Sequence, residues 1–323
     1  MHRRPAMLAV AVLAVAVLAV SVVLVAGCSS GPPSAVQPPP PDGRSRVLRV
    51  VAGFYPAAWL ATEIGGDRVS VRDITPAGAE PHDIELSAGS VDDVQRADLA
   101  IVMGRGFQPA VERAAAARRS GTLSLLDLLF DGADAGTDAA TDAGTKRAGE
   151  DPHVWLDPVL MDSMATGVEA AMVRADPSGA AVYATNAGRV HAALRSLDRR
   201  YRSGLAACAR KDIVTSHAAF GRLATRYGLH QEGIASSSPD AEPDPRRLAE
   251  LADLVEDRGV TTIFTEELLP TRLADTLARE TGTRTAVLSP LEALTADQTA
   301  AGSDYPAIMA ANLSVIRMAL GCT

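Results

Sequence analysis

Residues 177–207 read PSGAAVYATNAGRVHAALRSLDRRYRSGLAA and predict one long helix. Apolar side chains recur there at near-helical spacing, with charged side chains on the opposite side. The apolar positions are Val182, Val190, Ala193, Leu194, Leu197, Tyr201 and Leu205. A helix of about 28 residues spans roughly 40 Å, which exceeds the width of a small domain. We therefore expect this helix to run from one domain into the next as a stiff connection.

Short apolar runs alternate with helical patterns on both sides of this helix. The predicted strands are 47–52, 69–74, 99–103 and 122–126 before it, and 212–216, 229–234, 260–265 and 285–288 after it. Such alternation predicts parallel sheets with helices on both faces. The expected fold is therefore α/β, with two Rossmann-like lobes (47–176 and 208–323) joined by a long rigid helix (177–207). A ligand site is expected in the cleft between the lobes, beyond the carboxyl ends of the strands.

The N-terminus predicts export from the cytoplasm. Two arginines precede an apolar stretch within residues 1–27, as in a secretory signal peptide. The sequence Val-Ala-Gly-Cys at residues 25–28 resembles a bacterial lipobox, which implies cleavage before Cys28 and lipidation of its thiol. The alternative is an uncleaved membrane anchor. Both place the folded part outside the cytoplasm and attached to the cell membrane, with residues 28–46 as a flexible linker.

Cysteine and charge add two expectations. Cys208 and Cys322 form an even pair in an oxidising compartment, so we predict a disulfide bond, with two free thiols as the alternative. The net charge of −8 argues against nucleic acid as a partner.

Residues 131–150 are rich in Asp, Ala, Gly and Thr and predict a flexible surface loop. A role of its carboxylates in loading metal is the alternative.

Three histidines are candidate ligands for one metal ion. His82 and His153 each follow a proline, in Glu-Pro-His-Asp (80–83) and Asp-Pro-His-Val-Trp (151–155), and His217 ends an apolar run. Proline stiffens the backbone from which the imidazole is presented. Imidazole suits zinc, so the three together predict a zinc site.

These segments resemble those of the zinc- and manganese-binding lipoproteins that serve bacterial ABC importers as substrate-binding proteins. The resemblance rests on segments 80–83, 151–158, 216–220 and 289–292, in the right order over nearly all of the mature chain. It implies two α/β lobes joined by a rigid helix. It also implies that His82, His153 and His217 bind the metal.

A carboxylate often completes the site in relatives with three histidines. The matching position is Glu292, in a tetrapeptide that begins with Ser289 where relatives often have Asp or Asn. Glu266, Glu267 and a water molecule remain alternatives for this fourth ligand. Three imidazoles favour Zn²⁺, with Mn²⁺ or iron as the alternative cargo.

The predicted function is high-affinity zinc capture outside the cytoplasm and delivery to an ABC permease with a cytoplasmic ATPase. The protein is expected to be a monomer and not an enzyme. One alternative is a surface adhesin whose metal is structural. Another is a metallohydrolase, which would need an open metal position and a general base. The sequence has no His-Glu-x-x-His pattern.

Overall fold

The computed structural model describes residues 47–131, 151–237 and 245–323. The predicted signal peptide, Cys28, the linker and most of the acidic segment 131–150 lie outside these residues. The described residues all belong to one compact unit. Among the helices of the described residues, none has the length and apolar character needed to span a bilayer.

The first lobe is a parallel four-stranded sheet in the order β2-β1-β3-β4. Its elements are β1 (Leu48–Ala52), α1 (Tyr55–Gly65), a 3₁₀ turn (Gly66–Arg68), β2 (Val69–Asp73), α2 (Ala88–Arg96), β3 (Leu99–Val102), α3 (Pro109–Ala116), β4 (Thr122–Ser124) and α4 (Leu125–Phe130). Helices α1, α2 and α3 each carry the chain back to the edge of the sheet at which the next strand begins, which is the connection that parallel strands require.

The second lobe repeats this arrangement, in the order β6-β5-β7-β8. Its elements are β5 (Asp212–Thr215), α7 (Gly221–Tyr227), β6 (His230–Gly233), α8 (Pro245–Asp257), β7 (Thr262–Thr265), α9 (Arg272–Thr281), β8 (Arg284–Val287), α10 (Ala296–Ala300) and α11 (Tyr305–Leu320). The prediction of two parallel α/β lobes is confirmed.

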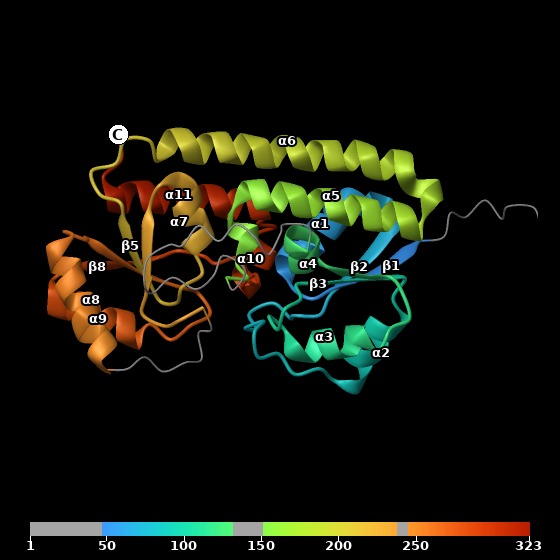
Figure 1. Cartoon of the computed structure of the whole chain (residues 1–323), viewed down its shortest axis with the longest axis horizontal. Helices are drawn as coiled ribbons and strands as arrows, with labels where there is room; N and C mark the ends of the chain where they lie inside the picture. Colours follow the sequence, from blue (N-terminus) through green and yellow to red (C-terminus); the bar gives the residue numbers. More distant parts are fainter. Residues whose placement is uncertain (1–46, 132–150, 238–244) are drawn as a thin grey trace, which may run out of the picture. The chain divides into compact units, whose positions relative to one another are not determined.

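Four consecutive elements connect the lobes: a 3₁₀ turn (Val154–Leu156), α5 (Pro158–Ala175), a second 3₁₀ turn (Pro177–Gly179) and α6 (Ala180–Gly204). Figure 1 shows α6 running along one side of both sheets. Its 25 residues span about 37 Å. Near its start, Asn186 bonds the carbonyl of Ile64 in α1 (3.0 Å), and near its end the Tyr201 hydroxyl bonds the carbonyl of Met309 in α11 (2.8 Å). The predicted long helix is therefore confirmed, and it packs on both lobes.

The start of α6 differs in two details from the prediction. Residues 177–179 form a separate 3₁₀ turn, so the helix begins at Ala180. Val182, expected on the apolar face, is 41% exposed, whereas its neighbour Tyr183 is fully buried. The buried positions from Tyr183 onward keep the helical spacing, so the predicted apolar face was wrong at Val182, and Ala193 lies only half-buried at its edge.

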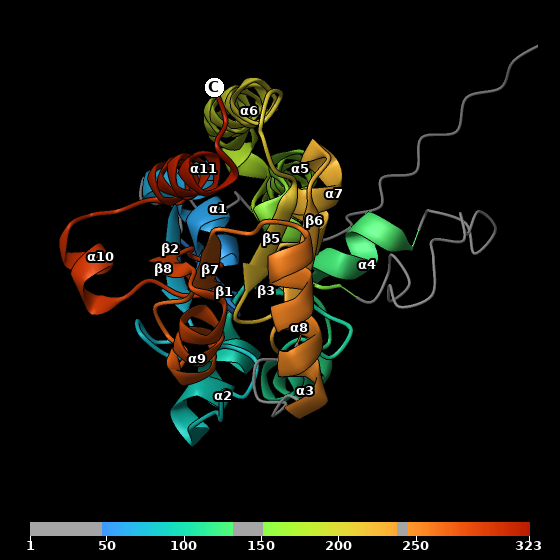
Figure 2. The same ribbon diagram turned by 90° about the vertical axis from the view of Figure 1, so that its left-hand side faces the viewer.

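One continuous hydrophobic core joins the two lobes on the side of α1, α5, α6, α7 and α11. A smaller core lies on the other face of each sheet, beneath α2 and α3 in the first lobe and beneath α8 and α9 in the second. Figures 1 and 2 show these two helix layers on opposite sides of the sheets. Alternate strand residues serve the two faces: Val50 belongs to the shared core and Val51 to the smaller one. The shared core makes the connection between the lobes stiff.

Two short helices were not predicted. The strand expected over 122–126 ends at Ser124, and the next residues form α4. Helix α10 has a capping box in which Thr295 and Gln298 bond each other's backbone N–H groups. Helices of five or six residues carry too few turns to show an apolar periodicity, so their local caps and packing determine them.

The predicted Cys208–Cys322 disulfide is present. It links the segment after α6 to the residue that follows the C-cap of α11. The backbone N–H groups of Ala209 and Arg210 also bond the carbonyls at the end of α11. The bond therefore closes the second lobe at the far end of the connecting helix.

Candidate metal centre

His82 lies on an irregular segment that follows the carboxyl end of β2. Its backbone N–H donates to Glu80 Oε1 (3.0 Å). The buried amide of Gln108 donates to the carbonyls of Pro81 (3.3 Å) and Gly53 (2.9 Å), which ties the segment to the end of β1. The imidazole meets the ring of Phe107 edge-on at 4.5 Å and remains 9% exposed. This histidine thus forms the outer side of the site.

His153 is fully buried at the start of the 3₁₀ turn before α5. Both its backbone N–H (3.0 Å) and its ring Nδ1 (2.8 Å) bond Asp151 Oδ1. This bond places the other ring nitrogen, Nε2, toward the site. Asp157, four residues further along, caps α5 through the N–H of Val159 (2.9 Å) and pairs with Arg226. Asp151 instead orients the imidazole.

His217 follows β5 by two residues and is also fully buried. Glu266 follows β7 directly, and its Oε1 accepts from the backbone N–H (3.1 Å) and Nδ1 (2.9 Å) of His217. The two strands are neighbours at the point where the strand order reverses, where α/β sheets usually bind ligands. Sheet topology therefore brings this histidine and this carboxylate together.

Glu292 reaches the site from the turn after β8. Pro290 and Leu291 precede it, and Leu291 has a left-handed backbone (φ 57°) although it is buried and not a glycine. The Trp155 indole donates to the Pro290 carbonyl (2.8 Å), which links this turn to the segment of His153. Trp155 is also fully buried in the shared core, so it packs there as well as making this bond.

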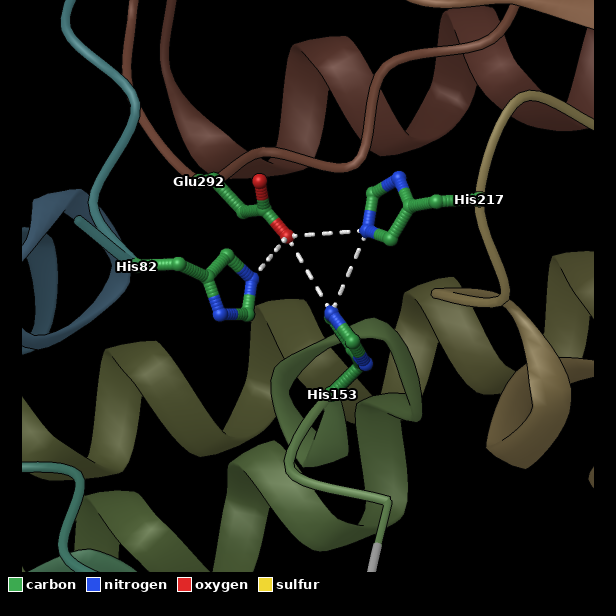
Figure 3. A group of neighbouring side chains, drawn as sticks. All are labelled: His82, His153, His217 and Glu292. Atoms are coloured by element: carbon green, nitrogen blue, oxygen red, sulfur yellow. Dashed lines mark hydrogen bonds and ion pairs between the residues drawn. The ribbon is translucent and has the colours of Figure 1, made fainter. Parts of the chain in front are cut away.

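Figure 3 shows the four side chains converging, with one carboxylate oxygen directed at three imidazoles. Glu292 Oε1 lies 3.2 Å from Nε2 of His153, 3.3 Å from Nε2 of His217 and 3.4 Å from Nε2 of His82. The Nε2 atoms of His153 and His217 are 3.3 Å apart. One donor atom from each side chain lies within 4.8 Å of all the others. Three imidazole nitrogens and one carboxylate oxygen are a donor set for a divalent transition metal.

The pKa values show how strongly these groups interact. Burial alone would lower the pKa of His217, but Glu266 and Glu292 outweigh it and raise the pKa to about 10. For His153, burial is likewise outweighed by Asp151 and Glu292, so its pKa is raised. Burial would raise the pKa of Glu292, yet the three imidazoles hold it well below its usual range. An ion that bound the ring nitrogens of His153 and His217 would therefore displace protons from them.

The two alternative carboxylates for the fourth ligand, Glu266 and Glu267, are not part of the four-residue group. Glu266 bonds the Nδ1 side of His217, and burial raises its pKa. Glu267 accepts a hydrogen bond from Gln298 (3.1 Å) instead. Of the other histidines in the described residues, His191 bonds Asp162 (2.7 Å), which links α6 to α5, and His230 is 69% exposed. Neither belongs to the four-residue group.

The sequence interpretation missed the carboxylates that orient two of the imidazoles. The position of Asp151 two residues before His153 was visible in the sequence, and an Asp two residues from a candidate ligand can reach its ring. Glu266 was noticed only as a rival ligand. Its supporting role depends on β5 and β7 being neighbours, which no short sequence signal reveals.

The sequence matches the family described as ZnuA, zinc-uptake complex component A periplasmic, over residues 50–319. It is 34% identical over 304 residues to the high-affinity zinc uptake system protein ZnuA of Bacillus subtilis, with 92% of this chain and 94% of that protein covered. It is 33% identical over 293 residues to the zinc-binding lipoprotein AdcA of Streptococcus pneumoniae. This second match covers 85% of this chain but only 56% of AdcA.

The fold is similar to a crystal structure of the Zn(II)-bound ZnuA-like domain of the same pneumococcal AdcA. The TM-score is 0.69 at 33% identity, and the match covers 84% of this chain and 98% of that domain. The similarity therefore extends over almost the whole of a zinc-binding domain.

Proposed function

The chain belongs to the family of zinc-uptake complex component A, and from this premise we propose that it binds one Zn²⁺ ion through His82, His153, His217 and Glu292. The names of its relatives support zinc as the cargo. The proposed role is high-affinity capture of the ion for transport.

One observation carries the proposal, namely the spacing of the four donor atoms. A tetrahedral ion bound at about 2.0–2.1 Å has ligand-to-ligand distances of about 3.3–3.4 Å. Four of the six distances among these donor atoms are 3.2, 3.3, 3.3 and 3.4 Å, and all four atoms lie within 4.8 Å of one another. Four of the six spacings thus match those around a tetrahedral zinc ion, which supports a zinc site at these residues.

Zinc is favoured over manganese by the donor set as well as by this spacing. Manganese sites usually have more oxygen ligands and a higher coordination number. Here three of the four donors are imidazole nitrogens, and the carboxylate turns one oxygen toward them. Manganese or iron is therefore the second candidate, because the same ligands also bind these ions, only less tightly.

The closed geometry supports transport rather than catalysis. A catalytic zinc keeps one coordination position for water or substrate, whereas four protein donors occupy all the positions of a tetrahedral ion. His153 and His217 are fully buried and Glu292 nearly so. We therefore propose a binding protein and not a metallohydrolase.

We further propose that the protein is lipid-anchored through Cys28 outside the cytoplasm and delivers zinc to an ABC permease with a cytoplasmic ATPase. Relatives named as lipoproteins and as zinc-uptake components support this role. The proposed division is a signal peptide (1–27), a linker (28–46), two lobes (47–176 and 208–323) and a connecting helix (177–207). The proposed state is a monomer.

The test is a zinc titration of metal-free protein in competition with a chromophoric chelator. We expect one ion per chain, and strongly reduced affinity in His82→Ala, His153→Ala, His217→Ala and Glu292→Ala. His230→Ala is the matched control, because this exposed histidine lies outside the group. Wild-type affinity in all four ligand variants would refute the site.

A further inference from the structure

The turn that presents Glu292 contains a strained residue. Leu291 has φ 57° and is fully buried. A left-handed backbone is unfavourable for a residue with a branched side chain, so it persists only where the surroundings impose it. Because Leu291 directly precedes Glu292, its backbone conformation determines where the carboxylate points.

Asn312, on α11, supplies much of this constraint. Its Oδ1 accepts from the N–H of Ser289 (3.0 Å), and its Nδ2 donates to the carbonyl of Ser289 (2.7 Å). The side-chain amide thus bonds both backbone groups of one residue, as a neighbouring strand would. Ser289 Oγ in turn accepts from the N–H of Leu291 (3.3 Å). Asn312 is buried, so water does not readily replace these bonds.

The same helix face also fixes the segment of His153. Tyr305, seven residues before Asn312 in α11, donates its hydroxyl to the Trp155 carbonyl (2.5 Å). Residues seven apart lie on one face of a helix. The Trp155 indole then bonds the Pro290 carbonyl (2.8 Å), which joins the two turns directly. One face of α11 therefore holds the backbone of two turns that bear metal ligands.

We infer that Asn312 is a positioning residue that helps the site to discriminate zinc from larger divalent ions. This inference rests on the proposed zinc site. By holding the Ser289–Leu291 turn, Asn312 presents Oε1 of Glu292 to the three imidazoles while the second carboxylate oxygen points away (Figure 3). Coordination through one oxygen suits four-coordinate zinc.

Loosening the turn would change the coordination. A mobile carboxylate can bind through both oxygens or admit water, and either change raises the coordination number. Manganese favours higher coordination and more oxygen ligands than zinc does. Loss of the Asn312 hydrogen bonds should therefore weaken zinc binding more than manganese binding.

The test compares Asn312→Leu with Asn186→Leu. Each variant removes a buried amide, but that of Asn186 bonds the Ile64 carbonyl within the packing of α6 on α1, away from the site. Affinities for zinc and for manganese are measured by chelator competition, and the coordination number of bound zinc by X-ray absorption. In Asn312→Leu we expect a zinc affinity about 10–100-fold lower, a smaller loss for manganese and a coordination number above four.

Asn312→Asp serves as a second variant in case the leucine variant does not fold. It keeps the acceptor for the Ser289 N–H and loses the donor to the carbonyl, so we expect an intermediate fall in the zinc-to-manganese ratio. Asn186→Leu should lower the melting temperature and leave the ratio unchanged. A wild-type ratio with four-coordinate zinc in the folded Asn312 variants would overturn the inference alone. A wild-type protein without zinc affinity would overturn the proposed function.

Discussion

His82 and His217 contribute the same atom to the site from very different surroundings. His217 follows a central strand, is fully buried and bonds a buried carboxylate through Nδ1. His82 lies on an irregular segment and remains partly exposed. It contacts the ring of Phe107, and Gln108 donates a hydrogen bond to the carbonyl of the preceding residue, Pro81. One side of the site is thus fixed by a sheet and a buried ion pair, and the other by a loop.

This difference teaches where the organisation of the site resides. His153 and His217 each bond a carboxylate through Nδ1, which fixes the ring orientation and leaves Nε2 directed at Glu292. The continuous core and the bond between Trp155 and Pro290 hold the segments of His153 and Glu292 together without any ion. We therefore expect three ligands to be preorganised and His82 to complete the site.

The largest effects should come from removing the two contrasting ligands. Both His217→Ala and His82→Ala should lower zinc affinity by a factor on the order of 1,000, because a four-ligand site loses one donor. Only His217→Ala should also destabilise the metal-free protein, by about 3–5 kcal/mol, because it leaves the buried Glu266 without its partner. Chelator competition measures the affinity, and urea unfolding measures the stability.

The exposed His230 is the control for both variants, and its replacement by Ala should change neither quantity. Equal destabilisation of the metal-free protein by His82→Ala and His217→Ala would show that the two sides of the site are organised alike.

A smaller effect is expected from the carboxylates that orient the imidazoles. Glu266→Gln and Asp151→Asn should each reduce zinc affinity about 10–100-fold, because an amide supports the imidazole less well than a carboxylate does. Glu267→Gln is a control one residue away, since Glu267 bonds Gln298 instead. Calorimetric titration with a competing chelator gives the affinities. We call the part of the site formed by His153, His217 and their supporting carboxylates the deep side. If Glu266→Gln binds zinc as tightly as Glu267→Gln does, the deep side does not depend on its carboxylates.

The pH dependence gives a further test of the deep side. Burial would lower the pKa of His217, but Glu266 and Glu292 raise it from 6.5 to about 10 in the metal-free protein. The protonated ring therefore stabilises this state fully below pH 6.5, and the contribution is lost as the pH rises toward 10. Zinc must displace this proton, so its affinity should rise with pH over that interval.

Calorimetry at pH 7 in buffers of different ionisation enthalpy measures this proton release. We expect at least about one proton per zinc ion in the wild type. Glu266→Gln should release fewer, because the pKa of His217 falls when the carboxylate is lost. A binding enthalpy that is the same in every buffer would contradict the raised pKa.

Much of this arrangement was predictable from the sequence because its signals are local. The apolar periodicity of 177–207 predicts α6, and the proline before His82 and His153 marks both segments. Four side chains brought together by the structure were all candidates in the sequence. Whether they bind the metal remains a prediction.

The supporting residues were harder to predict because their roles depend on distant contacts. Glu266 supports His217 only because β5 and β7 are neighbours in the sheet. Asn312 and Ser289, which are hydrogen-bonded, lie 23 residues apart in the sequence, and the hydrogen-bonded Trp155 and Pro290 lie 135 residues apart. Val182 was misplaced for a different reason, since it lies in the first turn of α6, where the packed face is only beginning.

The smallest effect on zinc binding should come from reducing the disulfide. Cys208–Cys322 lies at the end of α6 and α11 and bonds no residue of the four-residue group. Its sequence separation of 114 residues makes it worth at most about 4–5 kcal/mol of stability in the chain-entropy model. A Cys208→Ser/Cys322→Ser double variant should therefore unfold at lower urea concentration, as measured by circular dichroism, yet bind zinc within about twofold of the wild type, since distant sites act independently. A large loss of zinc affinity in this variant would show that the deep side of the site depends on the whole second lobe and not on its local carboxylates.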